Sequence, residues 1–175
     1  DGDTAQTLLR NADLAMYQAK KVKRGSYRFF TPELNEKMYE RFRLSAEIQR
    51  ALDQNEFVLF YQPTIQMRTG RICGAKALIR WVHPLRGILL PALFLPVAEE
   101  SGLIARLSEW VILNVCRQIQ LWQPNGWTIP VAVKLFDSCF QGQGFADVVE
   151  TLLEETRVPP TSLELELTET AIMQD

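Results

Sequence analysis

Charged side chains interrupt three stretches that are otherwise apolar and have the length of strands. They are Lys76 and Arg80 in residues 72–82, Lys134 in residues 129–135, and Glu164 and Glu166 in residues 163–168. A strand covered on both faces is apolar throughout, so charged positions within such strands indicate a site. We expect them to converge where the loops after parallel strands build active sites. The alternative is a buried network of salt bridges among Lys76, Lys134 and Glu166, which is costly to desolvate.

Alternation along the strands places these charges on one face. In residues 72–82, Lys76 shares a face with Leu78 and Arg80, whereas the residues between them are apolar. Gln62 closes the first predicted strand and adds a further polar group. One face of the sheet is therefore expected to be apolar and the other to carry the candidate site.

The segments that position these residues alternate between short apolar strands and amphipathic helices. The predicted strands are residues 57–62, 72–82, 129–135 and 163–168, and the predicted helices are residues 91–99, 103–122 and 145–156. The longest helix is indicated by apolar residues three or four positions apart from Ile104 to Trp122. Alternation of strands and helices predicts βαβ units, a parallel sheet and an α/β fold.

The N-terminal part predicts a helix, a short strand and a second long helix. Apolar spacing favours a helix over residues 4–21, and the aromatic run at residues 26–30 favours a strand. Thr-Pro-Glu at residues 31–33 is typical of a helix start, and an apolar stripe continues to about residue 53. This second helix is either a rigid spacer between two domains or a helix that transmits their orientation.

Composition indicates an ordinary globular protein and excludes several partners. Of the 175 residues, 47% are hydrophobic and 23% are charged, and the net charge is −2. A nucleic-acid polymer is not expected as a partner, because the chain has no Lys/Arg cluster. No membrane segment is expected in this chain, since its longest apolar stretch, residues 88–98, is short and interrupted by two prolines.

The three cysteines point to a reducing compartment. Cys73, Cys116 and Cys139 are odd in number, lack CxxC spacing and lie among apolar residues. They are predicted to be buried reduced thiols of a cytoplasmic protein. Any membrane attachment would lie outside this chain.

Several motifs carry a resemblance to a known family. They are Tyr61-Gln62-Pro63, Lys76-Ala77-Leu78-Ile79-Arg80, the run from Phe94 to Ile104 and the run from Leu163 to Thr170. With these motifs, residues 55–175 resemble the first part of the EAL family of cyclic di-GMP phosphodiesterases. The resemblance implies a TIM-like (β/α) barrel that is only partial, because the strand–helix units are too few to close eight strands.

The N-terminal residues resemble a second family. Residues 8–20, followed by residues 27–30, are similar to the last helix and strand of a GGDEF diguanylate cyclase domain. The predicted organisation is the end of a GGDEF-like domain (1–30), a linker helix (31–54) and the N-terminal part of an incomplete EAL-like domain (55–175). This is the order of bacterial tandem GGDEF–EAL signalling proteins.

The resemblance implies that the family's metal ligands are largely replaced. Lys76 stands at the position of a metal-binding glutamate and Lys134 at that of an asparagine ligand, while Glu166 is retained as the vestige of a metal site. The Mg or Mn of the family requires oxygen ligands, and an ammonium is not a ligand while protonated. We therefore expect no metal cofactor and no catalytic residue. Glu169 matches an acid that orders a regulatory loop near the family's dimer interface.

The residues that contact the dinucleotide in the family are retained. Gln62, Leu78 and Arg80 match such positions, and Arg80 corresponds to an arginine that reaches a phosphate. Arginine suits this role because its rigid fork donates two charge-assisted hydrogen bonds. Lys76 and Lys134 would then stand in for the missing metal, binding phosphate without generating a nucleophile. The resemblance predicts a non-catalytic cyclic di-GMP receptor or regulatory domain, with cyclic di-GMP as partner.

Two alternatives stay open from the sequence. One is a cyclic di-GMP phosphodiesterase that is active only in an intact parent protein, and the other is a protein-interaction scaffold without nucleotide. An unclosed parallel barrel also leaves an edge strand and apolar faces uncovered. A homodimer or a swapped oligomer is therefore expected.

Overall fold

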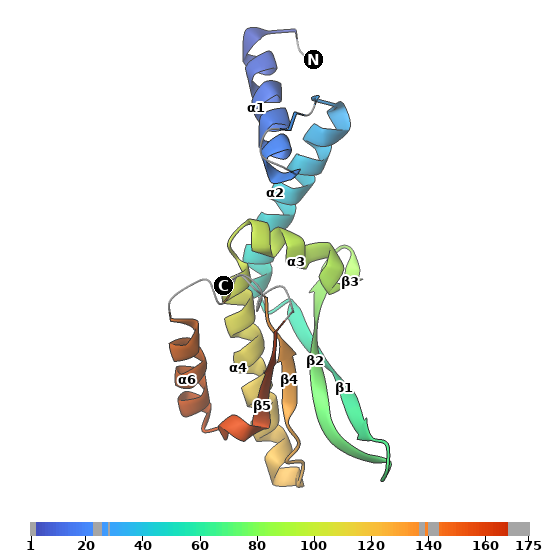
Figure 1. The fold of residues 1–175 in the computed structure, drawn as a ribbon, viewed down its shortest axis with the longest axis vertical. Helices are drawn as coiled ribbons and strands as arrows, with labels where there is room; N and C mark the ends of the chain where they lie inside the picture. Colours follow the sequence, from blue (N-terminus) through green and yellow to red (C-terminus); the bar gives the residue numbers. More distant parts are fainter. Residues whose placement is uncertain (1–2, 23–25, 28, 137–138, 140–143, 168–175) are drawn as a thin grey trace. The chain divides into compact units, whose positions relative to one another are not determined.

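The computed structural model describes residues 3–22, 26–27, 29–136, 139 and 144–167 (Figure 1). The chain divides into two compact units, residues 1–46 and residues 47–175. The division falls inside helix α2 (Pro32–Asp53), which is the helix predicted as a linker. No helix of the described residues has the length and apolar character needed to cross a bilayer.

The first unit contains α1 (Ala5–Val22) and the beginning of α2. Both helices lie within two residues of their predicted bounds, because their apolar spacing and N-terminal signals are local. The Thr31 side-chain oxygen accepts a hydrogen bond from the Leu34 N–H at 3.3 Å, which is the predicted N-cap. The pKa of Glu33 is lowered by hydrogen bonds from its own backbone N–H and from Thr31 at this helix start.

The strand predicted at residues 26–30 is not formed by the described residues of that stretch, which are 26, 27, 29 and 30. The Tyr27 and Phe29 rings instead contact each other edge to face, with centroids 5.6 Å apart. A strand exists only where its backbone forms a ladder with a neighbouring strand, and the sheet of the described residues does not include this stretch. Aromatic composition alone therefore overestimated strand formation here.

The second unit is built on a mixed sheet of five strands. These are β1 (Phe57–Gln66), β2 (Arg71–His83), β3 (Gly87–Leu89), β4 (Val131–Lys134) and β5 (Leu163–Glu166). The strand order is β1-β2-β4-β5, with β3 paired to β2. The pairs β2–β4 and β4–β5 are parallel, as predicted, so the fold is α/β.

The prediction of an all-parallel sheet is wrong for the first strands. β1 and β2 are antiparallel, and so are β2 and β3. Only residues 67–70 connect β1 to β2, and such a short connection makes a hairpin, whereas a parallel pair needs a crossover of a dozen residues or more. Gly70 has a φ of 68°, a left-handed conformation that glycine adopts without strain.

Three helices follow the predicted bounds closely: α3 (Pro91–Glu100), α4 (Ile104–Trp122) and α6 (Phe145–Thr156). Short 3₁₀ turns occur at Gln123–Asn125 and Pro160–Ser162. Figure 1 shows α4 running alongside β4 and β5, with α6 beside α4. The core consists of side chains from α4, α6 and one sheet face, among them Ile112, Val115, Ile119, Leu152, Ala77, Val131 and Val133.

Two of the cysteines are buried, and one is not. Cys116 and Cys139 are buried as predicted, and burial raises the pKa of the Cys116 thiol. Cys73 is exposed, contrary to prediction. It lies in residues 71–74 of β2, which pair with β1 but precede the first residue paired with β4. The apolar neighbours of Cys73 are therefore in a hairpin end outside the core. All three thiols are free.

The end of α2 is fixed to the carboxyl end of β2. Ile48 and Ala51 are fully buried, and Glu47 Oε2 lies 3.4 Å from His83 Nε2 and 3.4 Å from Arg86 Nη2. The other ring nitrogen of His83, Nδ1, accepts hydrogen bonds from the backbone N–H of Leu85 and Arg86 at 3.1 and 3.2 Å. His83 thus orders the turn after β2.

Candidate functional site

One face of the sheet collects the polar residues that were singled out in the sequence. In the strand register Gln62 lies opposite Lys76, Lys76 lies beside Ala132, and Lys134 lies beside Glu166. Neighbouring residues at matched register share a face, and residues two apart on one strand do as well. Gln62, Lys76, Leu78, Arg80, Lys134 and Glu166 therefore all belong to the same face, which we call the polar face.

An ion pair joins two of these residues across a third strand. Lys76 Nζ on β2 donates to Glu166 Oε2 on β5. Strand β4 lies between them, and its residue at this level is Ala132. The small side chain of Ala132 leaves room for the lysine stem to pass over β4. This contact brings together two of the residues that the sequence predicted to converge.

The alternative of a buried three-residue salt-bridge network is wrong in two respects. The Lys76 and Glu166 side chains are 35% and 40% exposed, so the pair is accessible from solvent. Lys134 is exposed and has no ion-pair partner among the described residues. A half-exposed pair contributes little to stability, on the order of 0–1 kcal/mol. The arrangement thus leaves an accessible ammonium at Lys134 next to the Lys76–Glu166 pair.

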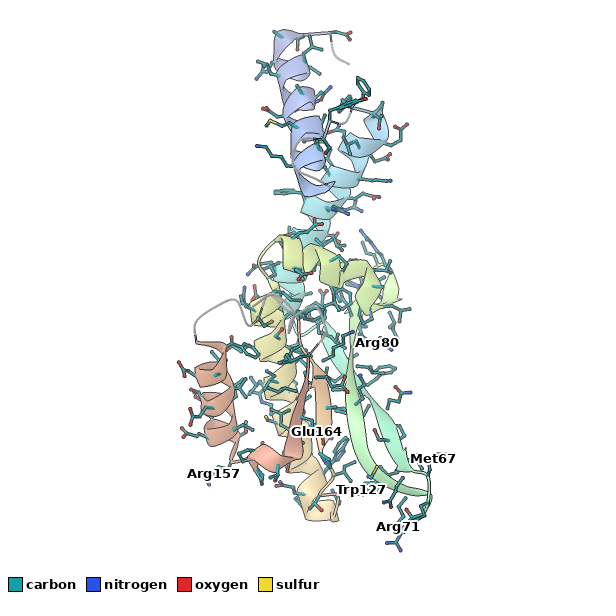
Figure 2. All side chains as sticks on the ribbon, viewed as in Figure 1. Met67, Arg71, Arg80, Trp127, Arg157 and Glu164 are labelled. Carbon is teal, nitrogen blue, oxygen red and sulfur yellow. The ribbon has the colours of Figure 1, made fainter. Side chains whose placement is uncertain are left out.

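Arg80 lies two residues beyond Leu78, toward the carboxyl end of β2 (Figure 2). Its Nη1 donates to the Ile79 carbonyl at 2.8 Å, and its Cζ lies 5.8 Å from the centroid of the Phe60 ring. The side chain is partly exposed. The guanidinium therefore retains further N–H donors for an anion while its position is restricted by Phe60 and by the backbone.

A cavity of about 130 Å³ lies beside these residues. Its lining combines three residues of the polar face with residues of the covered face and of the helices, which are Lys76, Leu78, Lys134, Ala77, Ile79, Val133, Leu135, Leu95, Leu107 and Val111. Pockets that enclose a drug-sized ligand measure roughly 300–1,000 Å³, so this cavity is too small to hold such a ligand, and it extends between the sheet and the helices.

The residues of the polar face do not fit a divalent cation. Such a cation needs several oxygen ligands, and here the carboxylate of Glu166 already binds the ammonium of Lys76. Within the described residues no three His, Cys, Asp or Glu side chains cluster in a manner that could hold a metal ion. Glu169, predicted to order a regulatory loop, lies outside the described residues.

The sequence of residues 45–175 matches the family model of the EAL domain. The chain belongs to the EAL domain family. The EAL resemblance noted from its motifs is thereby confirmed, and the mixed α/β fold agrees with it. The structure of the phosphodiesterase MucR in complex with c-di-GMP matches with a TM-score of 0.73 and 38% identity, over 76% of this chain and 54% of that one.

Two curated relatives of this EAL chain are aligned over nearly its whole length. The bifunctional diguanylate cyclase/cyclic di-GMP phosphodiesterase MucR of Pseudomonas aeruginosa is 40% identical, over 100% of this chain and 26% of MucR. The cyclic di-GMP phosphodiesterase PdeR of Escherichia coli is 36% identical, over 99% of this chain and 26% of PdeR. The chain thus spans about a quarter of the length of these relatives.

Two residues of the polar face were not singled out from the sequence. Phe60 contacts Arg80, and Ala132 gives the Lys76 side chain its path to Glu166. Phe60 could have been found, since it lies two residues before Gln62 and so shares its face. Ala132 carries no such signal, because its role depends on which strands become its neighbours.

Proposed function

We propose that this chain is part of a non-catalytic EAL domain that binds cyclic di-GMP without a metal ion. The observation that carries the proposal is the ion pair of Lys76 with Glu166. It places a fixed positive charge beside the one retained carboxylate of the predicted metal site, where a second cation would be repelled. Relatives of the family are named as cyclic di-GMP phosphodiesterases, which supports the ligand class.

Binding would use the cations of the polar face in place of a metal. Arg80 would donate charge-assisted hydrogen bonds to a phosphate, and Lys76 and Lys134 would neutralise the remaining phosphate charge. Gln62 and Leu78 would contact the rest of the dinucleotide. None of these residues lowers the pKa of a water molecule as a metal ion does, so no nucleophile is generated and the bound dinucleotide is not cleaved.

The N-terminal unit is proposed to be the end of a GGDEF-like domain, followed by the linker helix. Two observations support this organisation. Helix α1 forms at residues 5–22, and the alignment with the bifunctional diguanylate cyclase/phosphodiesterase MucR includes these residues. The EAL domain would then receive its signal through α2, whose end is fixed to β2 by Glu47, His83 and Arg86.

The test measures binding and hydrolysis of cyclic di-GMP by the protein expressed from its full coding sequence. Calorimetry in chelator is expected to show binding, and the addition of Mg²⁺ or Mn²⁺ is expected to leave the affinity unchanged. Chromatography of the same mixtures is expected to show no linear dinucleotide. Turnover that requires metal would establish the phosphodiesterase alternative, and the absence of any binding would favour the scaffold alternative.

A further inference from the structure

We infer that Phe60 is a ligand-binding residue of the polar face, against which a base of the bound cyclic dinucleotide stacks. The inference deepens the proposed function and rests on it. It follows from the place of Phe60 in the sheet, from its exposure and from its contact with Arg80.

Phe60 is an aromatic side chain presented to solvent from the middle of a paired strand. It is 49% exposed, whereas its neighbours Leu59 and Tyr61 point to the other face and pack against the core. Its register partner on β2 is Leu78, so it lies at the level between Lys76 and Arg80. An exposed aromatic ring in this position contributes little to the core and presents its face to a ligand.

The contact with Arg80 places a phosphate-binding group next to this aromatic surface. The guanidinium carbon lies 5.8 Å from the Phe60 ring centroid, a cation–π geometry that restricts the arginine. A nucleotide joins a planar base to a phosphate through one sugar, so a receptor needs an aromatic surface and a cation side by side. Stacking on aromatic side chains is tolerant of base identity, since every base has a π-face.

Two other exposed aromatic rings of the described residues, Phe42 and Trp127, lack this combination. Phe42 is 79% exposed on α2, but it belongs to the first unit, outside the sheet that carries the polar face. Trp127 is 48% exposed and lies at the other end of the sheet, near the tip of the β1–β2 hairpin (Figure 2). Of these three rings, only Phe60 is beside Arg80.

The test compares Phe60→Leu, which keeps an apolar side chain but removes the ring, with Phe60→Trp, which enlarges it. Phe60→Leu is expected to weaken binding of cyclic di-GMP by roughly 5- to 100-fold, the range for one base stacked on an aromatic ring. Phe60→Trp is expected to bind at least as tightly as the unsubstituted protein. Phe42→Leu is the matched control and should leave the affinity unchanged.

A double variant separates stacking from an indirect effect through Arg80. If Phe60 touches the base, Phe60→Leu weakens binding further in an Arg80→Ala background, whereas an effect that acts only through the arginine disappears there. Thermal unfolding midpoints should be the same for Phe60→Leu and the unsubstituted protein, since the ring lies outside the core. Equal affinity of Phe60→Leu and the unsubstituted protein would overturn the inference and leave the proposed function intact. The failure of the unsubstituted protein to bind would overturn both.

Discussion

The two faces of the central sheet differ although the same strands build them. On the face toward α4 and α6, Ala77, Val131 and Val133 are buried, with exposed fractions of 8%, 0% and 2%. On the polar face, the side chains of Lys76 and Glu166 are 35% and 40% exposed. Adjacent residues of one strand therefore differ in burial according to the face they lie on. The covered face contributes buried apolar surface to the core, and the polar face is accessible to solvent.

The largest expected effect comes from a polar substitution on the covered face. Val133→Asn should lower the free energy of unfolding by roughly 3–5 kcal/mol, because it removes buried apolar surface and leaves an amide without hydrogen bonds. Lys134→Asn, at the next residue, should change it by less than about 0.5 kcal/mol, as is usual at exposed positions. Urea denaturation of the two variants measures both values. Similar losses at the two positions would contradict the division between faces.

On the polar face the largest effect is expected for the arginine. Arg80→Ala removes charge-assisted hydrogen bonds worth about 1.5–3 kcal/mol, so cyclic di-GMP should bind roughly 10- to 100-fold more weakly. Arg71→Ala is the control, since Arg71 lies at the hairpin end of the same strand (Figure 2). Calorimetry distinguishes the two variants. An equal loss for Arg71→Ala would point to general electrostatic attraction in place of a site at Arg80.

A smaller and conditional effect is expected when the charge at position 76 is reversed. Lys76→Glu should weaken binding by about tenfold in chelator, since it loses a cation and adds repulsion between two carboxylates. Added Mg²⁺ should restore part of the affinity, because the introduced carboxylate and that of Glu166 together can bind a cation. Calorimetry with and without the metal tests this. Equal affinity in both conditions would contradict the role of Lys76 as a substitute for metal.

The smallest effect concerns the pH dependence of the covered face. Burial, and to a smaller extent the neighbouring Cys116 thiol, raises the pKa of Tyr61 to about 12. The ring lies 4.9 Å from the Trp122 ring, edge to face. The folded-state pKa exceeds the ordinary value of 10.0, so the stability contributed by neutral Tyr61 is fully present below pH 10 and is lost as pH rises toward 12.

Tyrosinate absorbance during an alkaline titration measures this ionisation. The component with a midpoint near pH 12 should be missing in Tyr61→Phe, and that variant should lose less stability between pH 10 and pH 12. Gln62, the next residue, lies on the polar face, so Gln62→Ala should leave the titration unchanged. A Tyr61 component near pH 10 would show that this part of the face is open to water.

Local features were predicted well because they depend on neighbours in the sequence. The bounds of α2, α4 and α6 followed from apolar spacing and from the Thr31 cap, and alternation along β2 correctly separated Ala77 from Lys76. The EAL motifs were also readable, and the family match at residues 45–175 agrees with them. For this protein, the amino-acid sequence alone determined the long helices, the four main strands of the sheet, the alternation of their faces and the family.

Tertiary structure decided the features that depend on which strands meet. The antiparallel β1–β2 pair, the short strand β3 and the exposure of Cys73 follow from pairing partners that no local pattern specifies. The same holds for the contact of Lys76 with Glu166, which are separated by 90 residues and are brought together because β4 pairs with both β2 and β5. Backbone hydrogen bonds between segments far apart in the sequence set which strands become neighbours. The spacing of residue types along the chain does not specify these pairings.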